Sequence, residues 1–200
     1  MNRFWILSSW IFVLAISKGP IQTPSLPNAA ELCTDKDYAI FAAALDHLYG
    51  GKKLDSVLVL DRTSTGVPPG LAGVAGLRNR IQGFYDRVPE EARRDFDARN
   101  KNRRGLESNK IKASFDVVLM HDEDSTSFYA SGGWKAFYET HPGTQGIWLI
   151  SLPGINREHD HALLYIGHAC GSNCGGGTVL FLGKEAGKWK VIDNETLWLT

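Results

Sequence analysis

Hydrophobic residues recur with a helical period near the start of the chain. Those between residues 38 and 48 are separated by three and four positions: Tyr38, Phe41, Leu45 and Leu48. This spacing places them on one face of a helix. Thr34 with Asp37 three residues later is typical of a capped helix start, and Gly50-Gly51 is typical of a helix end. The pattern predicts a helix of about 14 residues that packs by one face.

The middle of the chain alternates between strand and helix patterns. A uniformly apolar run at 56–61 predicts a buried strand, and the glycine- and proline-rich residues 66–76 predict a loop. Helical spacing returns at 77–88, and Pro89 followed by two glutamates is typical of the first turn of another helix. Residues 113–120 predict a strand, and residues 133–138 a short aromatic helix.

Charged residues dominate positions 90–104, where Phe96 is the chief apolar residue. Acids and bases are mixed in this segment. The mixture favours a solvated helix face over a basic binding patch.

Four apolar runs fill the last third of the chain, and turn-rich segments separate them: residues 146–152, 162–168, 178–182 and 188–192. Their branched and aromatic residues predict neighbouring strands of an antiparallel sheet. In the last run, alternation sends Trp189 and Val191 inward and the flanking lysines outward. The fold class is therefore α+β, with N-terminal helices packed on a C-terminal antiparallel sheet. A nuclear transport factor 2-like cone is one specific form of it.

The first residues predict export. Arg3 precedes the uncharged residues 4–16, and Ala15 and Ser17 are small, which is the pattern of a signal peptide cleaved just after Ser17. The alternative is a retained anchor, but the run is shorter than the roughly 20 residues that cross a bilayer. We expect a signal peptide at 1–17, a flexible spacer at 18–33 and a single domain at 34–200. The mature protein is then secreted or periplasmic, with no membrane span.

Net charge excludes two classes of partner. The chain has 22 lysines and arginines against 22 acids and a pI near 7.0. Such a balance gives no long-range attraction to nucleic acid or to anionic lipid, so we expect neither as a partner.

The chain has three cysteines, which are the residues that could form disulfide bonds. Cys170 and Cys174 are close enough in sequence to close a small disulfide loop between two strands, as expected in an oxidising compartment. Two other interpretations remain open, a zinc site with His168 and a redox dithiol, although the spacing is wider than either usually has. Cys33 is left over and is free, buried or paired between molecules.

Several motifs resemble a family of uncharacterised bacterial exported proteins. The chain has a Trp-x-x-Phe-Tyr segment at 134–138, a Pro-Gly turn at 142–143, a Cys-Gly-x-x-Cys-Gly hairpin at 170–175 and a closing Lys-Trp-Lys-Val strand. The similarity covers roughly residues 35 to 200. It implies an exported, disulfide-bearing domain and no particular activity.

Two polar clusters contain residue types that bind metal ions or transfer protons. His121-Asp122-Glu123-Asp124 has the groups for a hard cation or for acid–base work. His159-Asp160-His161 has two histidines that alternation sends to one side of a strand edge. Charged loop tips explain both clusters more simply, so we expect no metal site and no cofactor.

Whether the protein is an enzyme stays open at this point, because the chain has no Gly-x-Ser-x-Gly elbow, His-Glu-x-x-His helix or Walker loop. The leading hypothesis is a non-enzymatic exported domain. It binds a small ligand or an envelope protein through the concave sheet face or the aromatic edge of Trp134, Phe137 and Tyr138. The alternative is a metal-assisted or acid–base hydrolase of the cell envelope, with acids drawn from this set: Asp61, Glu107, Asp116 and residues 121–124. A structural role, with dimers linked through Cys33, is a third hypothesis.

Overall fold

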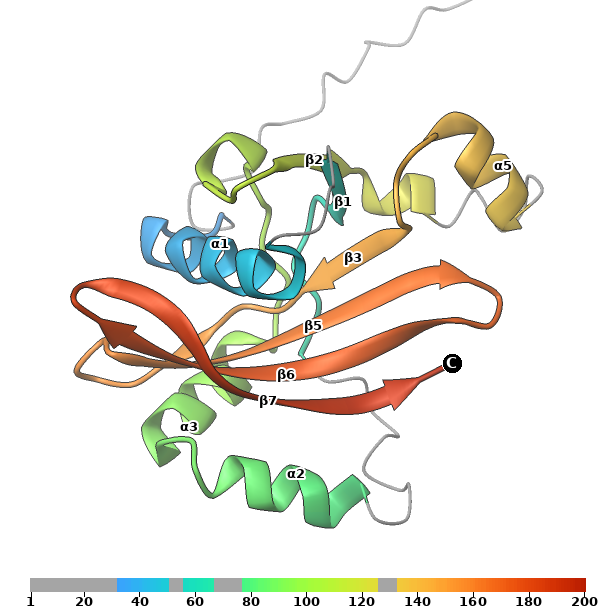
Figure 1. Ribbon diagram of the computed structural model, residues 1–200. Coiled ribbons are helices and arrows are strands. Elements are labelled where there is room, and N and C mark those ends of the chain that lie inside the picture. The colour runs from blue at the N-terminus through green and yellow to red at the C-terminus, as the bar shows by residue number, and fades with distance from the viewer. Residues whose placement is uncertain (1–31, 51–55, 67–76, 126–132) are drawn as a thin grey trace, which may run out of the picture.

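The computed structural model describes residues 32–50, 56–66, 77–125 and 133–200. In this part of the chain, one sheet carries helices on both faces (Figure 1). The predicted signal peptide and nearly all of the spacer, residues 1–31, lie outside the described residues, as does most of the predicted loop at 66–76. The α+β class is confirmed.

Helix α1 (Asp35–Tyr49) has the length and the start that the sequence predicts. The Asp37 carboxylate accepts hydrogen bonds from the Thr34 amide, at 2.8 Å, and from the Thr34 hydroxyl, at 2.9 Å. The apolar positions of the predicted face are buried: Tyr38, Phe41 and Leu45. The helix therefore packs by that face, as the spacing requires.

The sheet has seven strands, in the order β2-β1-β3-β5-β6-β7, with β4 paired to β5. In chain order they are β1 (Ser56–Leu60), β2 (Asp116–Met120), β3 (Ile147–Ile150), β4 (Gly154–Ile155), β5 (His161–Gly171), β6 (Cys174–Glu185) and β7 (Lys188–Leu199). The antiparallel prediction holds from β3 to β7. It is wrong for β1, which is parallel to both β2 and β3.

The connections between strands explain this difference. Antiparallel neighbours are joined by tight hairpins, whereas parallel strands need a crossover of a dozen or more residues. Between β1 and β2 the chain forms α2 (Leu77–Tyr85), α3 (Glu90–Arg99) and the short 3-10 helix η3 (Ser108–Lys110), and between β2 and β3 it forms α5 (Gly133–Thr140). These helices give the chain the length to return to the same end of the sheet.

Helices cover the two faces of the sheet in different places (Figure 1). On the face that we call the α1 face, α1 packs over side chains such as Val59, Ile150 and Leu180. On the opposite face, α2 and α3 cover β5 to β7, and α5 covers β1 and β3. Trp189 and Val191 pack against the α1-side core, and their lysine neighbours are exposed, as predicted.

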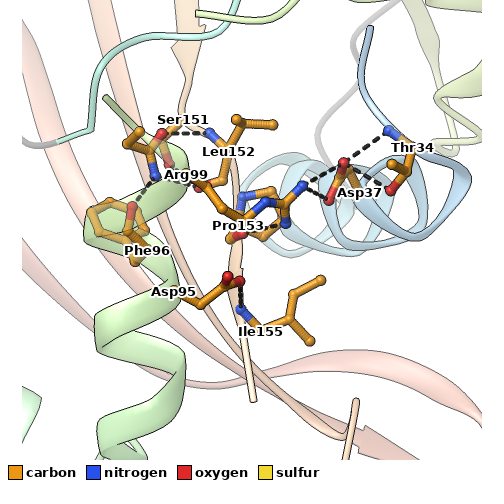
Figure 2. A network of polar contacts seen from close by, with 10 residues as sticks. Thr34, Asp37, Asp95, Phe96, Arg99, Ser151, Leu152, Pro153 and Ile155 are labelled. Atoms are coloured by element: carbon orange, nitrogen blue, oxygen red, sulfur yellow. Dashed lines mark hydrogen bonds and ion pairs between the residues drawn. The ribbon is translucent and has the colours of Figure 1, made fainter. Parts of the chain in front are cut away.

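A buried polar network joins α1 to α3 and to the segment after β3 (Figure 2). Asp37 is fully buried, and the Arg99 guanidinium donates to both of its carboxylate oxygens at 2.9 Å. Arg99 also donates to the Pro153 carbonyl, at 2.7 Å, and the Asp95 carboxylate accepts from the Ile155 amide, at 2.8 Å. The prediction of a solvated face over residues 90–104 is therefore wrong for these side chains, because the inner side of α3 bonds to the sheet.

Close packing of α3 on β4 depends on one glycine. A Cβ at Gly154 would lie 2.2 Å from the Ala92 carbonyl oxygen and 2.3 Å from the Phe96 amide nitrogen. Because both atoms belong to the helix backbone, any larger residue would push α3 away from the sheet.

Cys33 is buried, with 6% of its surface exposed. Burial raises the pKa of its thiol to about 12, so it is protonated at neutral pH. The position of the sulfur favours the buried interpretation over a cysteine that links two molecules.

Candidate functional site

A row of side chains crosses four strands on the α1 face beyond the end of the helix. Strand register pairs Trp148 of β3 with His168 of β5, His168 with Gly176 of β6, and Gly176 with Leu199 of β7. Three members of this row carry bulky side chains and Gly176 carries none. The row therefore has a gap in its middle.

A hollow of about 400 Å³ lies over this gap. We call it the hairpin hollow, and its lining is mainly apolar: Leu48, Trp148, Ile166, His168, Cys170, Cys174, Gly175, Gly176, Thr178, Leu199 and Thr200. Leu48 is in the last turn of α1, so the helix forms one wall and the tip of the β5–β6 hairpin forms another. His168 and the two threonines add a few polar groups to this lining.

Aromatic stacking makes the floor of the hollow rigid. The imidazole of His168 lies flat on the Trp148 indole, with ring centroids 3.8 Å apart and planes 7° apart. Tyr49 meets the same indole edge-on, at 4.7 Å. The His168 Nε2 donates to the Gln145 carbonyl, which fixes the orientation of the ring. Each ring is thus held by its neighbours before any ligand arrives.

The predicted disulfide between Cys170 and Cys174 is present. It closes the tip of the β5–β6 hairpin, where the two strands are joined by a shorter turn than predicted, because β6 begins at Cys174. The Tyr138 hydroxyl donates to the Cys170 carbonyl, at 2.9 Å. The sulfurs bond to each other, so neither is available as a thiolate ligand for zinc. The redox interpretation stays a prediction, because a disulfide is the oxidised form of a dithiol.

The aromatic edge predicted on α5 divides into two parts. Phe137 is 1% exposed and belongs to the core, so a ligand cannot reach it. Trp134 and Tyr138 pack against the same cluster and remain partly exposed. The structure thus gives Tyr138 a role in supporting the hairpin, and ligand binding by Trp134 and Tyr138 stays a prediction.

Two of the predicted acid–base residues meet at the carboxyl ends of the parallel strands β1 and β2. His121 Nδ1 donates to Asp61 Oδ2 at 2.7 Å, and this hydrogen bond and the carboxylate charge raise the pKa of the exposed imidazole. Asp61 Oδ1 accepts from the Asp122 amide, at 3.1 Å. We call Asp61 and His121 the Asp61–His121 pair.

Asp122 itself faces another partner. The guanidinium of Arg103 donates to both of its carboxylate oxygens and lowers the pKa of that carboxyl. Of the other predicted acids, Glu107 pairs with Lys110, at 2.8 Å, and Asp116 is exposed at the start of β2. Neither joins the Asp61–His121 pair.

Alternation predicts that His159 and His161 lie on one side of the strand edge. This prediction is wrong. His161 stacks on Phe181, on the α2–α3 side, with centroids 5.5 Å apart. The His159 Nε2 instead lies 3.5 Å from the Lys36 ammonium of α1. His159 has a left-handed backbone, with φ of 58°, which breaks the strand alternation at this residue.

Comparison with known proteins returns no match: no family model, curated protein or solved structure resembles this chain. Within the described ranges, no helix is long and apolar enough to cross a membrane. The same ranges contain no group of three or more His, Cys, Asp or Glu residues placed to hold a metal ion.

Proposed function

We propose that this protein is an exported domain that binds a small, largely apolar ligand in the hairpin hollow. The observation that carries the proposal is the gap at Gly176 in a row of bulky side chains, under a hollow of about 400 Å³. Small-molecule sites have this size and this mixture of apolar walls with a few polar groups. The preformed Trp148–His168 stack lowers the entropy cost of binding, because its rings are already ordered.

A substitution that fills the gap tests the proposal. The added Cβ of Gly176→Val would lie 2.9 Å from Leu199 Cδ2. Leu199 is 78% exposed, so its side chain can move away, and the Trp198 carbonyl oxygen, 3.3 Å from the added Cβ, has to shift by only a few tenths of an ångström for the sheet to accept valine. Asn194→Val is the matched control, since it places the same side chain at an exposed position of the neighbouring strand.

The assay is a ¹⁹F NMR screen of small neutral fluorinated fragments against the purified protein. We expect hits whose affinity falls at least about tenfold, or about 1.4 kcal/mol, in Gly176→Val and is unchanged in the control. Near-UV circular dichroism checks that both variants keep the native packing. A screen with no hits, or hits that bind Gly176→Val as tightly as the wild type, would reject the hollow as the binding site.

Export is part of the same proposal. The disulfide at the hairpin tip supports it, because such bonds persist in secreted and periplasmic proteins. Mass spectrometry of the protein recovered from the source cells tests it: the mature chain is expected to begin at Lys18, and a chain that retains Met1 in the cytoplasm would contradict it.

The nuclear transport factor 2-like cone is a specific form of the fold. The position of α1 across the sheet supports this form, and the parallel pairing of β1 opposes it.

The Asp61–His121 pair favours a second candidate function, an acid–base hydrolase. Asp61 holds Nδ1–H of the imidazole, which leaves Nε2 as the basic nitrogen of a side chain that is 82% exposed. In this reaction Nε2 takes the proton from an attacking water, Asp61 stabilises the imidazolium, and the proton then passes to the leaving group.

Hydrolysis of a panel of p-nitrophenyl esters and phosphates tests this candidate. His121→Ala should abolish any activity found, and His47→Ala, at an exposed position of α1, should not. Equal rates in the two variants would remove the Asp61–His121 pair from consideration. Elemental analysis of the same samples tests the metal-assisted form, which requires stoichiometric metal.

A further inference from the structure

A second opening lies at the other end of α1, where its first turn meets the loop before β5 and the β6–β7 turn. Two hollows, of about 380 and 430 Å³, share Lys36, Ile155 and His159 in their linings. Lys184 and Trp189 complete one side of the smaller hollow. We call the surface of these five residues the basic groove.

Each acid that lines the two hollows bonds to a group other than Lys36 or Lys184. Asp37 is paired with Arg99 and Asp95 accepts from the Ile155 amide. Asp35, which is 91% exposed, lies 3.6 Å from Lys110. Arg157, which also lines the larger hollow, pairs with Glu91. Within the described residues, no carboxylate pairs with the other two cations, Lys36 and Lys184.

These two lysines contact neutral or basic groups instead. The Lys36 ammonium lies 3.5 Å from the imidazole of His159, and the Lys184 ammonium lies over the Trp189 ring, 5.3 Å from its centroid. Cations that line a hollow and have no carboxylate partner attract an anion more strongly than the same cations on a convex surface, because the walls exclude part of the screening water.

The loop that presents His159 is fixed before any ligand binds. The buried side chain of Asn156 donates to Asp160, at 2.7 Å, and accepts from the Asp160 and His161 amides, at 3.1 and 2.9 Å. The His159 amide donates to the Asn156 carbonyl, at 3.1 Å. These bonds hold His159 in its left-handed conformation, which turns its ring towards α1 and not along the strand.

We propose that the basic groove binds a small amphipathic anion. The carboxylate or phosphate head lies at Lys36 and His159, within reach of Lys184, and an apolar chain lies against Ile155 and Trp189. Both parts of the ligand are needed. The head supplies the missing counter-charge, and the chain covers apolar side chains that α1 leaves uncovered.

Isothermal titration calorimetry of the purified protein with octanoate, octyl phosphate and octanol tests the proposal. We expect saturable binding of at least one of the two anions and at least about tenfold weaker binding of neutral octanol. If only octyl phosphate binds, the head group of the ligand is a phosphate. If only octanoate binds, the head group is a carboxylate. If both bind, the groove recognises the negative charge that the two head groups share. No saturable binding, or octanol binding as tightly as the anions, overturns the proposal.

Variants locate the site. Lys36→Gln/Lys184→Gln should weaken anion binding at least about tenfold, since two charge-assisted contacts are lost. Lys135→Gln is the control, because it makes the same change at an exposed position of α5. An equal loss in the control, or no loss in the double variant, would contradict the assignment.

Two further variants show whether a loss of anion binding comes from the basic groove itself, from misfolding or from the hairpin hollow. His159→Gly keeps a backbone that favours positive φ and removes the imidazole, so it should also weaken anion binding. Gly176→Val should leave anion binding unchanged. If Gly176→Val abolishes octanoate binding instead, the anion occupies the hairpin hollow and the basic groove is not its site.

Discussion

Removal of Arg99 is expected to destabilise the protein far more than removal of another arginine on the same helix. Arg99→Leu leaves the Asp37 carboxylate fully buried without its guanidinium partner. The Thr34 amide and hydroxyl continue to donate to that carboxylate, but neither supplies a positive charge. The Pro153 carbonyl also loses a donor.

The size of the effect follows from burial. Breaking a buried ion pair by removing one partner costs about 3–5 kcal/mol. The Arg99 side chain is 24% exposed, so water reaches part of the pair and we expect about 3 kcal/mol. Arg94 on the same helix pairs with Glu90 one turn earlier, where both side chains are well exposed. Arg94→Leu should cost only about 0.3–0.5 kcal/mol.

Urea unfolding followed by far-UV circular dichroism measures both free energies of unfolding by linear extrapolation. The double variant Asp37→Asn/Arg99→Leu should recover part of the loss, because an amide leaves no buried charge. If Arg99→Leu and Arg94→Leu differ by less than about 1 kcal/mol, the buried pair does not stabilise the α1–α3 contact as argued.

Three further predictions concern the cysteines and the Asp61–His121 pair. Cys33, with its pKa raised to about 12 by burial, should resist iodoacetamide in the native state and react once urea unfolds the chain; rapid native labelling would contradict its burial. Cys170→Ser/Cys174→Ser should lower the free energy of unfolding by about 2 kcal/mol on the chain-entropy model, and an unchanged urea midpoint would show that the loop adds nothing. The His121 imidazole should titrate above 6.5 by NMR. Asp61→Asn should lower that pKa. The stability that the pair adds is present below the ordinary imidazole pKa, while Asp61 is ionised, and is lost as pH rises through the raised pKa of the folded state. An identical titration in Asp61→Asn would show that the pair does not form.

Local patterns predicted much of the fold. The cap of α1 needs only Thr34 and Asp37, which are three residues apart, and its buried face follows from periodicity. The C-terminal strands pair with their neighbours in the chain through short turns, so alternation and turn residues identify them. The parallel pairing of β1 was not predictable in this way, because an apolar run such as 56–60 carries no information on strand direction.

The candidate sites depend on contacts between distant residues. The Asp37–Arg99 pair joins positions 62 apart, and nothing near Arg99 in the sequence distinguishes it from Arg94. The sequence predicts a turn-rich segment between the runs 162–168 and 178–182, which includes Gly176, because glycine runs usually mark turns. The role of Gly176 follows only from the register that places it between His168 and Leu199. One available signal was a glycine inside an otherwise strand-like segment, which often marks the close approach of a ligand or another chain.

NMR mapping of a bound fragment tests the central claim most directly. Amide shifts in a ¹H–¹⁵N spectrum are recorded as the tightest neutral fragment is added to the purified protein. The account predicts that the largest changes fall on His168, Gly176 and Thr178, which line the hairpin hollow. Changes centred instead on Lys36 and Gly187, or on His121, would contradict it.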